Sequence, residues 1–596
     1  MTQPSIAYRV EFPDPGRHIY QIRLTVTDLD AGKHRLRLPV WTPGSYHVDD
    51  FSGDLFDLSI TLDRADRPII QTRKNQWEFE TAAPGTVDAT YSIYAYREGV
   101  RTSHLDVSHA YWNGAQLFLL IDNYKHLEHQ VDIGVPPGWH VSTGLDRVPG
   151  APHRYQAGNY DVLIDSPVEI GTHRTLTFEV DSKPHTIALW GEGNEDPVRL
   201  KADVERIVRT QKELFSDLPY QHYTFIFHLS DRRTGGLEHL NSTTCGMGRF
   251  DFRPFKEYRK VLSLIAHEFF HLWNVKRIHP DMLGPFDYDR EVHTHLLWAM
   301  EGFTEYYAAL SLRRAGLFSF EDYLEHIGDQ IQAYEKRPGR FVQSLSQSSF
   351  ETWTKFYRPT ADAANRQMSY YLKGELVGLC LDLEIRRRTD QRSSLDDVFK
   401  LLYQRYGRQG IGFPESVYQE TVEEVATSSF QEFFDRYIES VDPLPLDGML
   451  DNAGIKVIRR WKPRDPESGD QDSTEPVAWL GIEVKDDANH VGLDVTTSYS
   501  DGPAASLLSP GDRLVALNGY AMEKVADLEK RLQDDHRPGD LVNLHFFRRN
   551  HLETVPVVLG SSPPNQIKLE LVNDLSGQQA ALLRDWLHYA PIPPSV

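Results

Sequence analysis

Alternating hydrophobic and polar positions dominate the first third of the chain. Runs such as Tyr20–Val26 and His34–Leu38 alternate at every second residue, and turn residues of the Pro, Gly and Asp types separate them. A period of two places successive side chains on opposite faces of a half-buried strand. Residues 1–185 are therefore predicted to form an antiparallel β domain.

The hydrophobic period changes after Pro197. Apolar residues then recur at helical spacing until Phe215, and the apolar run Tyr223–Leu229 has the length of one strand. Further helices are predicted at 294–315, 323–334, 371–388 and 395–406, because apolar positions there repeat every three to four residues. Two largely helical domains, 186–340 and 341–460, follow from this pattern.

The last part of the chain is predicted to form a separate module. Residues 461–476 are polar, charged and rich in Pro and Gly, which predicts a linker. Strands and a helix near 525–533 are expected within 477–562. The tail, 563–596, contains a short amphipathic helix over Ala580–Leu587. The fold class is thus a multidomain α+β protein.

Composition excludes several classes of function. Acidic residues outnumber basic ones 86 to 64, for a net charge of -22, and the chain has no Lys/Arg-rich stripe that would favour nucleic acid as a partner. With two cysteines and no signal peptide at its start, the chain is expected in the cytoplasm. No apolar run approaches the roughly 20 residues that span a bilayer, so no membrane association is expected.

The segment Val261–Trp273 carries the clearest chemical signal. Within it His267 and His271 stand four residues apart, on one face of a predicted helix, and Glu268 follows the first histidine. Two imidazoles one turn apart can reach a single zinc ion, and the neighbouring carboxylate can move protons to and from water at that ion. The apolar surroundings favour a buried helix, where such groups are costly unless they are coordinated.

A catalytic zinc site typically uses three protein ligands and keeps one open position. Glu301 is the best third ligand, on a predicted helix whose same face carries Glu305 one turn later. Glu305 could serve as the ligand instead, but a second acid at this offset is better placed to orient a ligating imidazole, and Glu305 is assigned to that role. His293 and His295 are the rival ligands, but their i, i+2 spacing places them on different sides of a helix.

Five segments together resemble a known family. They are Trp41–Tyr46, Gly235–His239, His267–Arg277, Glu301–Tyr306 and Tyr370–Gly374. In this order they resemble the glycyl aminopeptidase family of zinc metallopeptidases, which is similar to the aminopeptidase N group. The resemblance covers nearly the whole chain, and it implies one zinc ion. It also implies a thermolysin-like, mostly α catalytic domain over 186–340, with a helical extension over 341–460.

The resemblance implies roles for single residues as well. The Glu of the family's Glu-Gly-Phe segment is the third zinc ligand, which carries over to Glu301. Tyr371 corresponds to the tyrosine that donates to the oxyanion, with Tyr370 as the alternative one place earlier. Between His271 and Glu301 lie 29 residues, more than in the aminopeptidase N motif, so the intervening loop is expected to bulge outward.

An aminopeptidase must also hold a free ammonium group, which a buried carboxylate can do through charge-assisted hydrogen bonds. Glu238 is the candidate, because its segment resembles the substrate-binding strand of aminopeptidase N enzymes. Leu237 and His239 replace the Met and Asn of that strand. Gly235 and Gly236 would let a peptide backbone approach closely.

Residues 477–562 resemble a PDZ domain. Trp479–Ile482 begins a strand, and the glycine-flanked segment Gly502–Gly519 follows it. Such domains add an extended peptide to a sheet edge and hold its carboxylate on loop N–H groups, here those around Leu480, Gly481 and Ile482. The alternative is a module that packs on the catalytic domain and binds nothing.

The sequence therefore predicts a zinc aminopeptidase acting on peptides, with Gly or Ala at the N-terminus suggested by the resemblance. One alternative is an endopeptidase fed by the PDZ-like domain, which would require Glu238 to face away from the zinc. Another is a non-catalytic peptide-binding protein with a structural metal. A structural zinc would need neither Glu268 nor an open coordination position, and this favours an enzyme.

Overall fold

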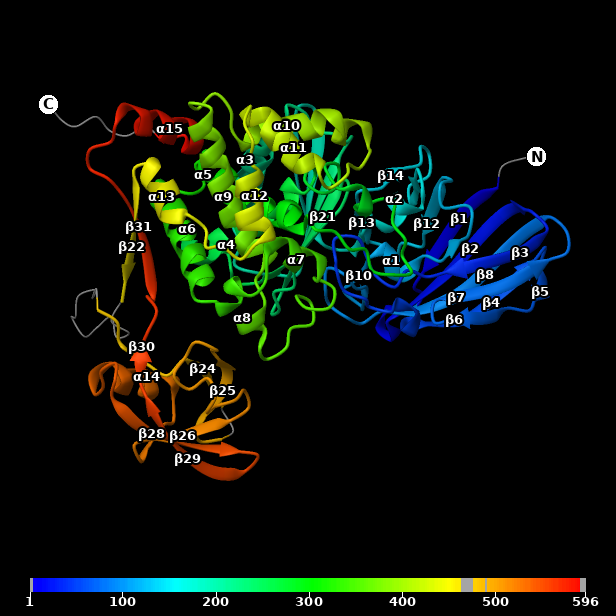
Figure 1. Ribbon diagram of the computed structural model, residues 1–596. Coiled ribbons are helices and arrows are strands. Elements are labelled where there is room, and N and C mark those ends of the chain that lie inside the picture. Colours follow the sequence, from blue (N-terminus) through cyan, green and yellow to red (C-terminus); the bar gives the residue numbers. More distant parts are fainter. Residues whose placement is uncertain (1–3, 462–474, 488–489, 590–596) are drawn as a thin grey trace. The chain divides into compact units, whose positions relative to one another are not determined.

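The computed structural model describes residues 4–461, 475–487 and 490–589 (Figure 1). The chain forms two compact units, the first comprising residues 1–294 and 399–415 and the second comprising residues 295–398 and 416–596. Of the predicted linker 461–476, all but positions 461, 475 and 476 lies outside the described residues. The architecture is the multidomain α+β fold that the periodicity predicts.

Strands fill the first part of the first unit, coloured blue to cyan in Figure 1. An eight-stranded sheet has the order β14-β15-β12-β1-β2-β8-β4-β5, and two four-stranded sheets have the orders β11-β3-β7-β6 and β13-β16-β10-β9. Alternate residues of β1 are buried, as the period of two requires. The bounds are β1 Ser5–Glu11, β2 Ile19–Leu29, β3 Gly32–Arg37, β4 Leu55–Leu62, β5 Ala65–Arg67, β6 Ile70–Arg73, β7 Gln76–Thr81, β8 Gly85–Tyr94, β9 His104–Leu105, β10 His109–Trp112, β11 Leu120–Ile121, β12 His129–Ile133, β13 His140–Thr143, β14 Asp146–Arg147, β15 Arg154–Ala157 and β16 Val168–Gly171.

A five-stranded sheet completes the first unit, in the order β17-β18-β19-β21-β20. Its middle strands β18, β19 and β21 run parallel, and every residue of β19 is buried. A strand covered on both faces reads as one continuous apolar run, which is the pattern of Tyr223–Leu229. The bounds are β17 Arg174–Val180, β18 Lys183–Trp190, β19 Tyr223–Ser230, β20 Gly235–Glu238 and β21 Ser242–Gly248, with helices α1 Gly114–Leu117, α2 Tyr160–Ile164, α3 Pro197–Phe215 and α4 Phe255–Phe270.

Helices dominate the first part of the second unit. The long helix α9 (Tyr370–Arg388) is buried along almost its whole length, and it packs against α5 (Phe303–Arg314), α6 (Phe320–Glu335) and α7 (Leu345–Phe350). The other elements are α8 Ala363–Arg366, α11 Val417–Ala426, α12 Gln431–Phe434, α13 Leu446–Asn452, and the antiparallel pair β22 Ile455–Arg460 and β31 Gln566–Leu571. Helix α10 (Leu395–Arg405) begins in the second unit and ends in the first.

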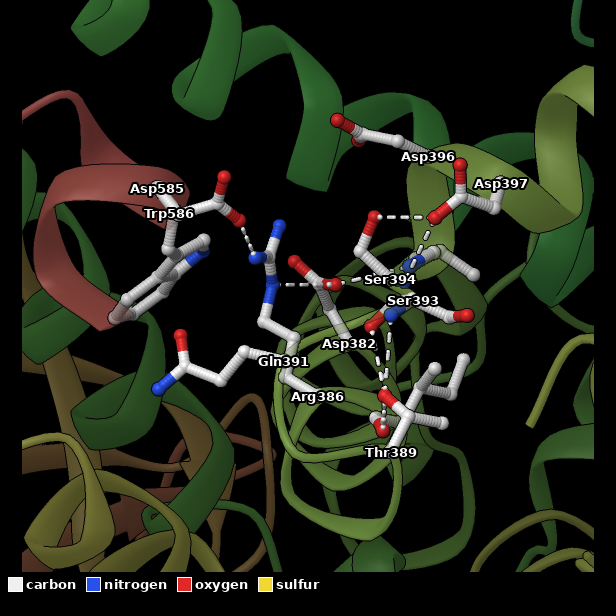
Figure 2. A network of polar contacts seen from close by, with 12 residues as sticks. Asp382, Arg386, Thr389, Gln391, Ser393, Ser394, Asp396, Asp397, Asp585 and Trp586 are labelled. Carbon is white, nitrogen blue, oxygen red and sulfur yellow. Dashed lines mark hydrogen bonds and ion pairs between the residues drawn. The ribbon is translucent and has the colours of Figure 1, made fainter. Parts of the chain in front are cut away.

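A buried ionic network holds the last helix, α15 (Gly577–Leu587), to α5 and α9 (Figure 2). Arg386 of α9 lies between Asp382 and Asp585, to both of which it donates. Trp586 donates from its indole N–H to Tyr306, at 2.8 Å, and the Tyr306 hydroxyl donates to Asp382 at 2.7 Å. An arginine buried between two carboxylates is compensated twice, so α15 is a structural part of the helical core.

The C-terminal module has its own hydrophobic core. Its sheet has the order β24-β25-β26-β28-β29, with β27 paired to β26, and helix α14 covers it. The core includes Leu480, Leu514 and Phe546, all fully or nearly fully buried. The bounds are β23 Ala478–Trp479, β24 Ile482–Asp486, β25 Leu493–Ser498, β26 Arg513–Leu517, β27 Tyr520–Ala521, α14 Val525–Asp534, β28 Leu541–Arg548, β29 His551–Val558 and β30 Gly560–Ser561.

Candidate metal centre

Helix α4 places both histidines of the motif at its C-terminal end. His267 lies in the last turn and His271 caps the helix with helical backbone angles, so the two rings share one face. Their Nε2 atoms face each other at 2.9 Å. The Nδ1 of His271 lies 2.7 Å from the backbone carbonyl of Asn274, to which it donates, and this leaves the Nε2 lone pair available as a metal ligand.

Three carboxylate and imidazole groups meet at this end of α4. Ligand atoms of Glu238, Glu268 and His271 lie within 4.8 Å of one another, and all three residues are buried. Two buried carboxylates so close together repel each other unless a cation lies between them. A divalent cation held by His271 beside these carboxylates would relieve that repulsion.

Strand β20 brings Glu238 to this position. It pairs antiparallel with β21, and it passes so close to α4 that a Cβ atom on Gly236 would overlap the carboxylate of Glu268. Gly235 has a positive φ of 78° but nothing within 4 Å of the position of a Cβ atom. The two glycines of the motif therefore differ: only Gly236 is needed for the approach of the strand to Glu268.

We expect Gly236→Ala to lower kcat about 10- to 100-fold, because the new methyl group must displace the Glu268 carboxylate and small misplacements of a catalytic group cost this much. The matched control is Gly235→Ala, which meets no atom and costs roughly 1 kcal/mol of backbone strain. Steady-state kinetics of the two variants, with circular dichroism to check folding, would measure the difference. Equal kcat values for both would contradict the role of the close approach.

The aromatic turn Trp41–Tyr46 also reaches this centre. Gly44 has a φ of 85°, and a Cβ atom there would lie 2.7 Å from both carboxylate oxygens of Glu238. The turn is anchored by Trp41, whose indole N–H donates to the carbonyl of Arg290 at 3.0 Å. The structure thus places the turn against the predicted amine-binding carboxylate.

The long segment after α4 provides that anchor. Val40 donates its backbone N–H to Tyr288 at 3.0 Å, and Asp289 accepts from Arg37 at 2.7 Å and from Asn75 at 2.8 Å. This part of the segment between His271 and Thr294 thus packs against the N-terminal domain and holds the Trp41 turn in place.

Lys276, which follows the motif, helps to fix the backbone next to Glu238 through Asp165. Lys276 contacts Asp165 at 2.8 Å, and Asp165 in turn lies 3.1 Å from the His239 ring and accepts from the Leu240 N–H. Burial raises the pKa of Asp165, but Lys276 and His239 outweigh it and hold the pKa below its usual range. Asp165 is therefore an anion that fixes the end of β20, one residue beyond Glu238.

The second unit carries the remaining predicted residues. Glu301 is almost fully buried in a single π-helical turn, Trp298–Gly302, that leads into α5. The sequence predicts a regular α-helix from residue 294. The structure instead has a π-helical turn here, and such turns are frequent at functional sites. A Cβ atom on Gly302 would overlap Gly374, and one on Gly374 would lie 2.9 Å from Gly302. The two glycines allow α9 and the π-helical turn to touch through their backbones.

The two neighbouring tyrosines of α9 have different surroundings. The Tyr370 hydroxyl accepts from Thr352 at 3.0 Å in the core, whereas the Tyr371 hydroxyl is 3.5 Å from that of Tyr357. Burial, followed by the charge of Glu301, raises the pKa of Tyr371 well above its usual range. The two hydroxyls therefore differ: that of Tyr370 accepts from Thr352, whereas that of Tyr371 lies near Tyr357 and the charge of Glu301.

The rival ligands have other contacts. The His295 ring is 3.0 Å from the Ser346 hydroxyl and stacks on Phe350. His293 is partly exposed in the segment before the π-helical turn. Glu305 stands in the first turn of α5, and its charge contributes to raising the pKa of His326. Neither the contacts of His295 nor the position of His293 makes either residue a better third metal ligand than Glu301.

Comparison with known proteins gives the family. The profile of the Peptidase M61 N-terminal domain matches residues 7–172, that of M61 glycyl aminopeptidase matches residues 260–377, and that of the PDZ domain matches residues 478–559. The crystal structure of an aminopeptidase N family protein from Idiomarina loihiensis is 31% identical, with 98% of this chain and 100% of that chain covered and a TM-score of 0.90. The chain belongs to the M61 glycyl aminopeptidase family. This M61 protein is a metallopeptidase with a PDZ domain.

A more distant solved structure is the M1 zinc metallopeptidase from Deinococcus radiodurans. It is 14% identical to the M61 protein, with 75% of this chain and 96% of that chain covered and a TM-score of 0.47. A search of curated proteins finds no match. Among the described residues of the M61 protein, no helix is both long and apolar enough to cross a bilayer.

Proposed function

We propose that the protein is a zinc aminopeptidase that removes the N-terminal residue of peptides. The observation that carries this proposal is the buried group of Glu238, Glu268 and His271. This group places the carboxylate of Glu238, in addition to that of the base Glu268, beside the metal-binding helix. A zinc ion held by three protein ligands, together with a general base, would suffice to hydrolyse a peptide bond anywhere in a chain. The additional carboxylate of Glu238 is what an exopeptidase needs to hold a free ammonium group.

In this proposal His267, His271 and Glu301 would hold the zinc ion, which supplies Lewis-acid polarisation of water and of the scissile carbonyl when it is bound. Glu268 takes a proton from the attacking water and delivers it to the departing amine. Tyr371 donates its hydroxyl proton to the developing oxyanion, which its raised pKa favours because the phenol stays protonated. Glu305 is proposed to orient the His267 ring, since the Asn274 carbonyl already holds His271.

The Glu238 role predicts a dependence on the free amine. Glu238→Gln is expected to lower kcat/KM for unblocked peptides about 10- to 100-fold, which corresponds to losing one charged hydrogen bond of about 1.5–3 kcal/mol. Glu205→Gln on the surface of α3 is the control. N-acetylated peptides should be poor substrates of the native enzyme, and cleavage of acetylated and free peptides at equal rates would show an endopeptidase instead.

We propose Gly or Ala as the preferred N-terminal residue, on the basis of the M61 glycyl aminopeptidase match. The expected outcome is that kcat/KM for Gly- and Ala-amides exceeds that for Leu-amide by at least about tenfold, a difference that side-chain discrimination in a pocket can supply. A competition assay with the three amides at equal concentration measures this ratio directly. A Leu-amide that is cleaved fastest would overturn the assignment of specificity but leave the aminopeptidase proposal standing.

The PDZ domain is proposed to bind the C-terminus of a peptide. A groove of about 410 Å³ lies between β24 and α14, with Leu480, Ile482, Val525 and Leu528 among its lining residues. Gln332 and Lys336 of α6 also line it, so the helical part of the second unit contributes to the groove. Fluorescence titration with one peptide in free-acid and C-terminally amidated forms tests the proposal. Equal affinity for both forms would contradict carboxylate recognition.

A further inference from the structure

A second cluster of histidines surrounds one carboxylate in the first unit, away from α4 in the sequence. Glu169 on β16 is fully buried, and its neighbours are His109 on β10, His228 on β19 and His173 just after β16. Ligand atoms of Glu169, His109 and His228 lie within 4.8 Å of one another. The cluster joins two sheets, because β10 and β16 belong to one and β19 belongs to the other.

The ring nitrogens in the cluster converge on the Glu169 carboxylate. His109 Nδ1 is 2.9 Å from Oε1, and His228 Nε2 is 2.9 Å from Oε2. His173 Nδ1 lies 4.0 Å from Oε1, and within the described residues it has no hydrogen-bond partner although its side chain is fully buried. A buried nitrogen without a partner costs roughly 1–3 kcal/mol, so His173 Nδ1 points to a missing contact.

The outer ring nitrogens are held by side chains, as is usual for metal-bound histidines. His109 Nε2 is 2.8 Å from Nδ1 of His104, and His173 Nε2 is 2.9 Å from the Ser142 hydroxyl. These contacts fix the ring orientations and leave Nδ1 of both histidines directed at Glu169. Trp190 stacks on the His109 ring at 3.7 Å and helps to exclude water.

The charges of the cluster also suit a cation. Over the described parts of the chain, every ion-pair contact of Glu169 is to an imidazole: His109, His173 or His228.

We propose that Glu169, His109 and His228 form a second metal site, for a divalent transition metal of the zinc class. Two imidazoles and one carboxylate are a zinc donor set, with bonds of about 2.0–2.2 Å and ligand atoms therefore roughly 3.3 Å apart, and the ligand atoms of these three residues already lie within 4.8 Å of one another. His173 lies next to this set, with its Nδ1 4.0 Å from Glu169 Oε1. Because the three ligands come from strands of two sheets, a bound metal would tie the sheets together.

The test is the metal content of the full-length protein, measured by inductively coupled plasma mass spectrometry after desalting. The native chain is expected to contain two equivalents of zinc. The double variant His267→Ala/His271→Ala, which leaves the second cluster intact, is expected to retain one equivalent. Finding no metal in that double variant, after refolding or dialysis with one equivalent of added zinc per chain, would overturn the proposal and identify the cluster as a hydrogen-bonded cage.

The converse variant is Glu169→Gln, which is expected to lose one equivalent and to unfold at a lower temperature while its remaining metal still supports peptidase activity. His185→Gln is the matched control, since His185 is also buried, lies on β18 and bonds to Tyr220. It should keep both equivalents. Two equivalents retained in Glu169→Gln would contradict the proposal. If this variant fails to fold, the double variant of α4 still decides the question.

Discussion

Replacing Glu268 with Gln is expected to lower kcat by about 10²- to 10⁴-fold, the contribution of general acid–base catalysis, while zinc stays bound. Glutamine keeps the shape of the side chain but cannot accept the proton of the attacking water. Glu268 is buried on α4, and its carboxylate lies against Gly236 and near Glu238. The substitution therefore removes the proton acceptor from the buried group of Glu238, Glu268 and His271.

The control for Glu268→Gln is Glu257→Gln in the first turn of the same helix, where the side chain is partly exposed and pairs with Lys260. It should change kcat by less than about twofold, because surface ion pairs contribute little. Metal content is measured on both variants. Native-like turnover by a zinc-loaded Glu268→Gln enzyme would contradict the assignment of the base.

Tyr371→Phe is expected to have the second-largest effect, a loss of about 10²- to 10³-fold in kcat with KM nearly unchanged, as for removal of one oxyanion donor. The loss falls on kcat because the hydrogen bond strengthens only as charge develops on the carbonyl oxygen.

Tyr370→Phe is the matched control for this variant. Its hydroxyl accepts from Thr352 in the core, so the substitution should cost about 1 kcal/mol of stability and leave kcat close to native. Thermal unfolding and steady-state kinetics of the two variants separate the roles. A larger loss of kcat in Tyr370→Phe than in Tyr371→Phe would reverse the assignment.

Local patterns predict the fold class and the metal-binding helix, because period-two runs, helical spacing and the His267–His271 pair are properties of neighbouring residues. The contacts that complete the centre are not local. Gly44 lies against Glu238, Lys276 reaches Asp165, and these partners are far apart in the sequence. The hydrophobic periodicity does not predict such contacts, so the position of the Trp41 turn beside Glu238 becomes apparent only once β20 and the segment before Thr294 are placed in space.

The π-helical turn at Glu301 shows a similar limit. The spacing of apolar residues predicts a regular α-helix from residue 294, because a single π-helical turn has no signature in the residue types. The signal that could reveal it is the glycine pair, Gly302 and Gly374, in two segments that each carry a candidate catalytic residue. Small residues at both positions indicate that two backbones meet there, and this contact within the second unit brings Tyr371 under the influence of Glu301.

The His109–Glu169–His228 cluster escapes sequence analysis for another reason. Its members lie on three strands with no common spacing, whereas the motif on α4 gathers its ligands within one helical turn. Sheet pairing alone brings β10 and β16 together, with Tyr111 opposite Glu169 and His109 opposite Gly171. A metal site built across strands is therefore visible only after the sheets are assembled.

The most direct test of the central claim is hydrolysis of Gly- and Ala-amides by the full-length enzyme before chelation, after chelation, and after stepwise return of zinc. The proposal predicts that a chelator abolishes cleavage, since zinc on His267, His271 and Glu301 is required, and that one equivalent of zinc per chain restores it. Full activity in chelated protein that has lost the zinc of this site would contradict the account.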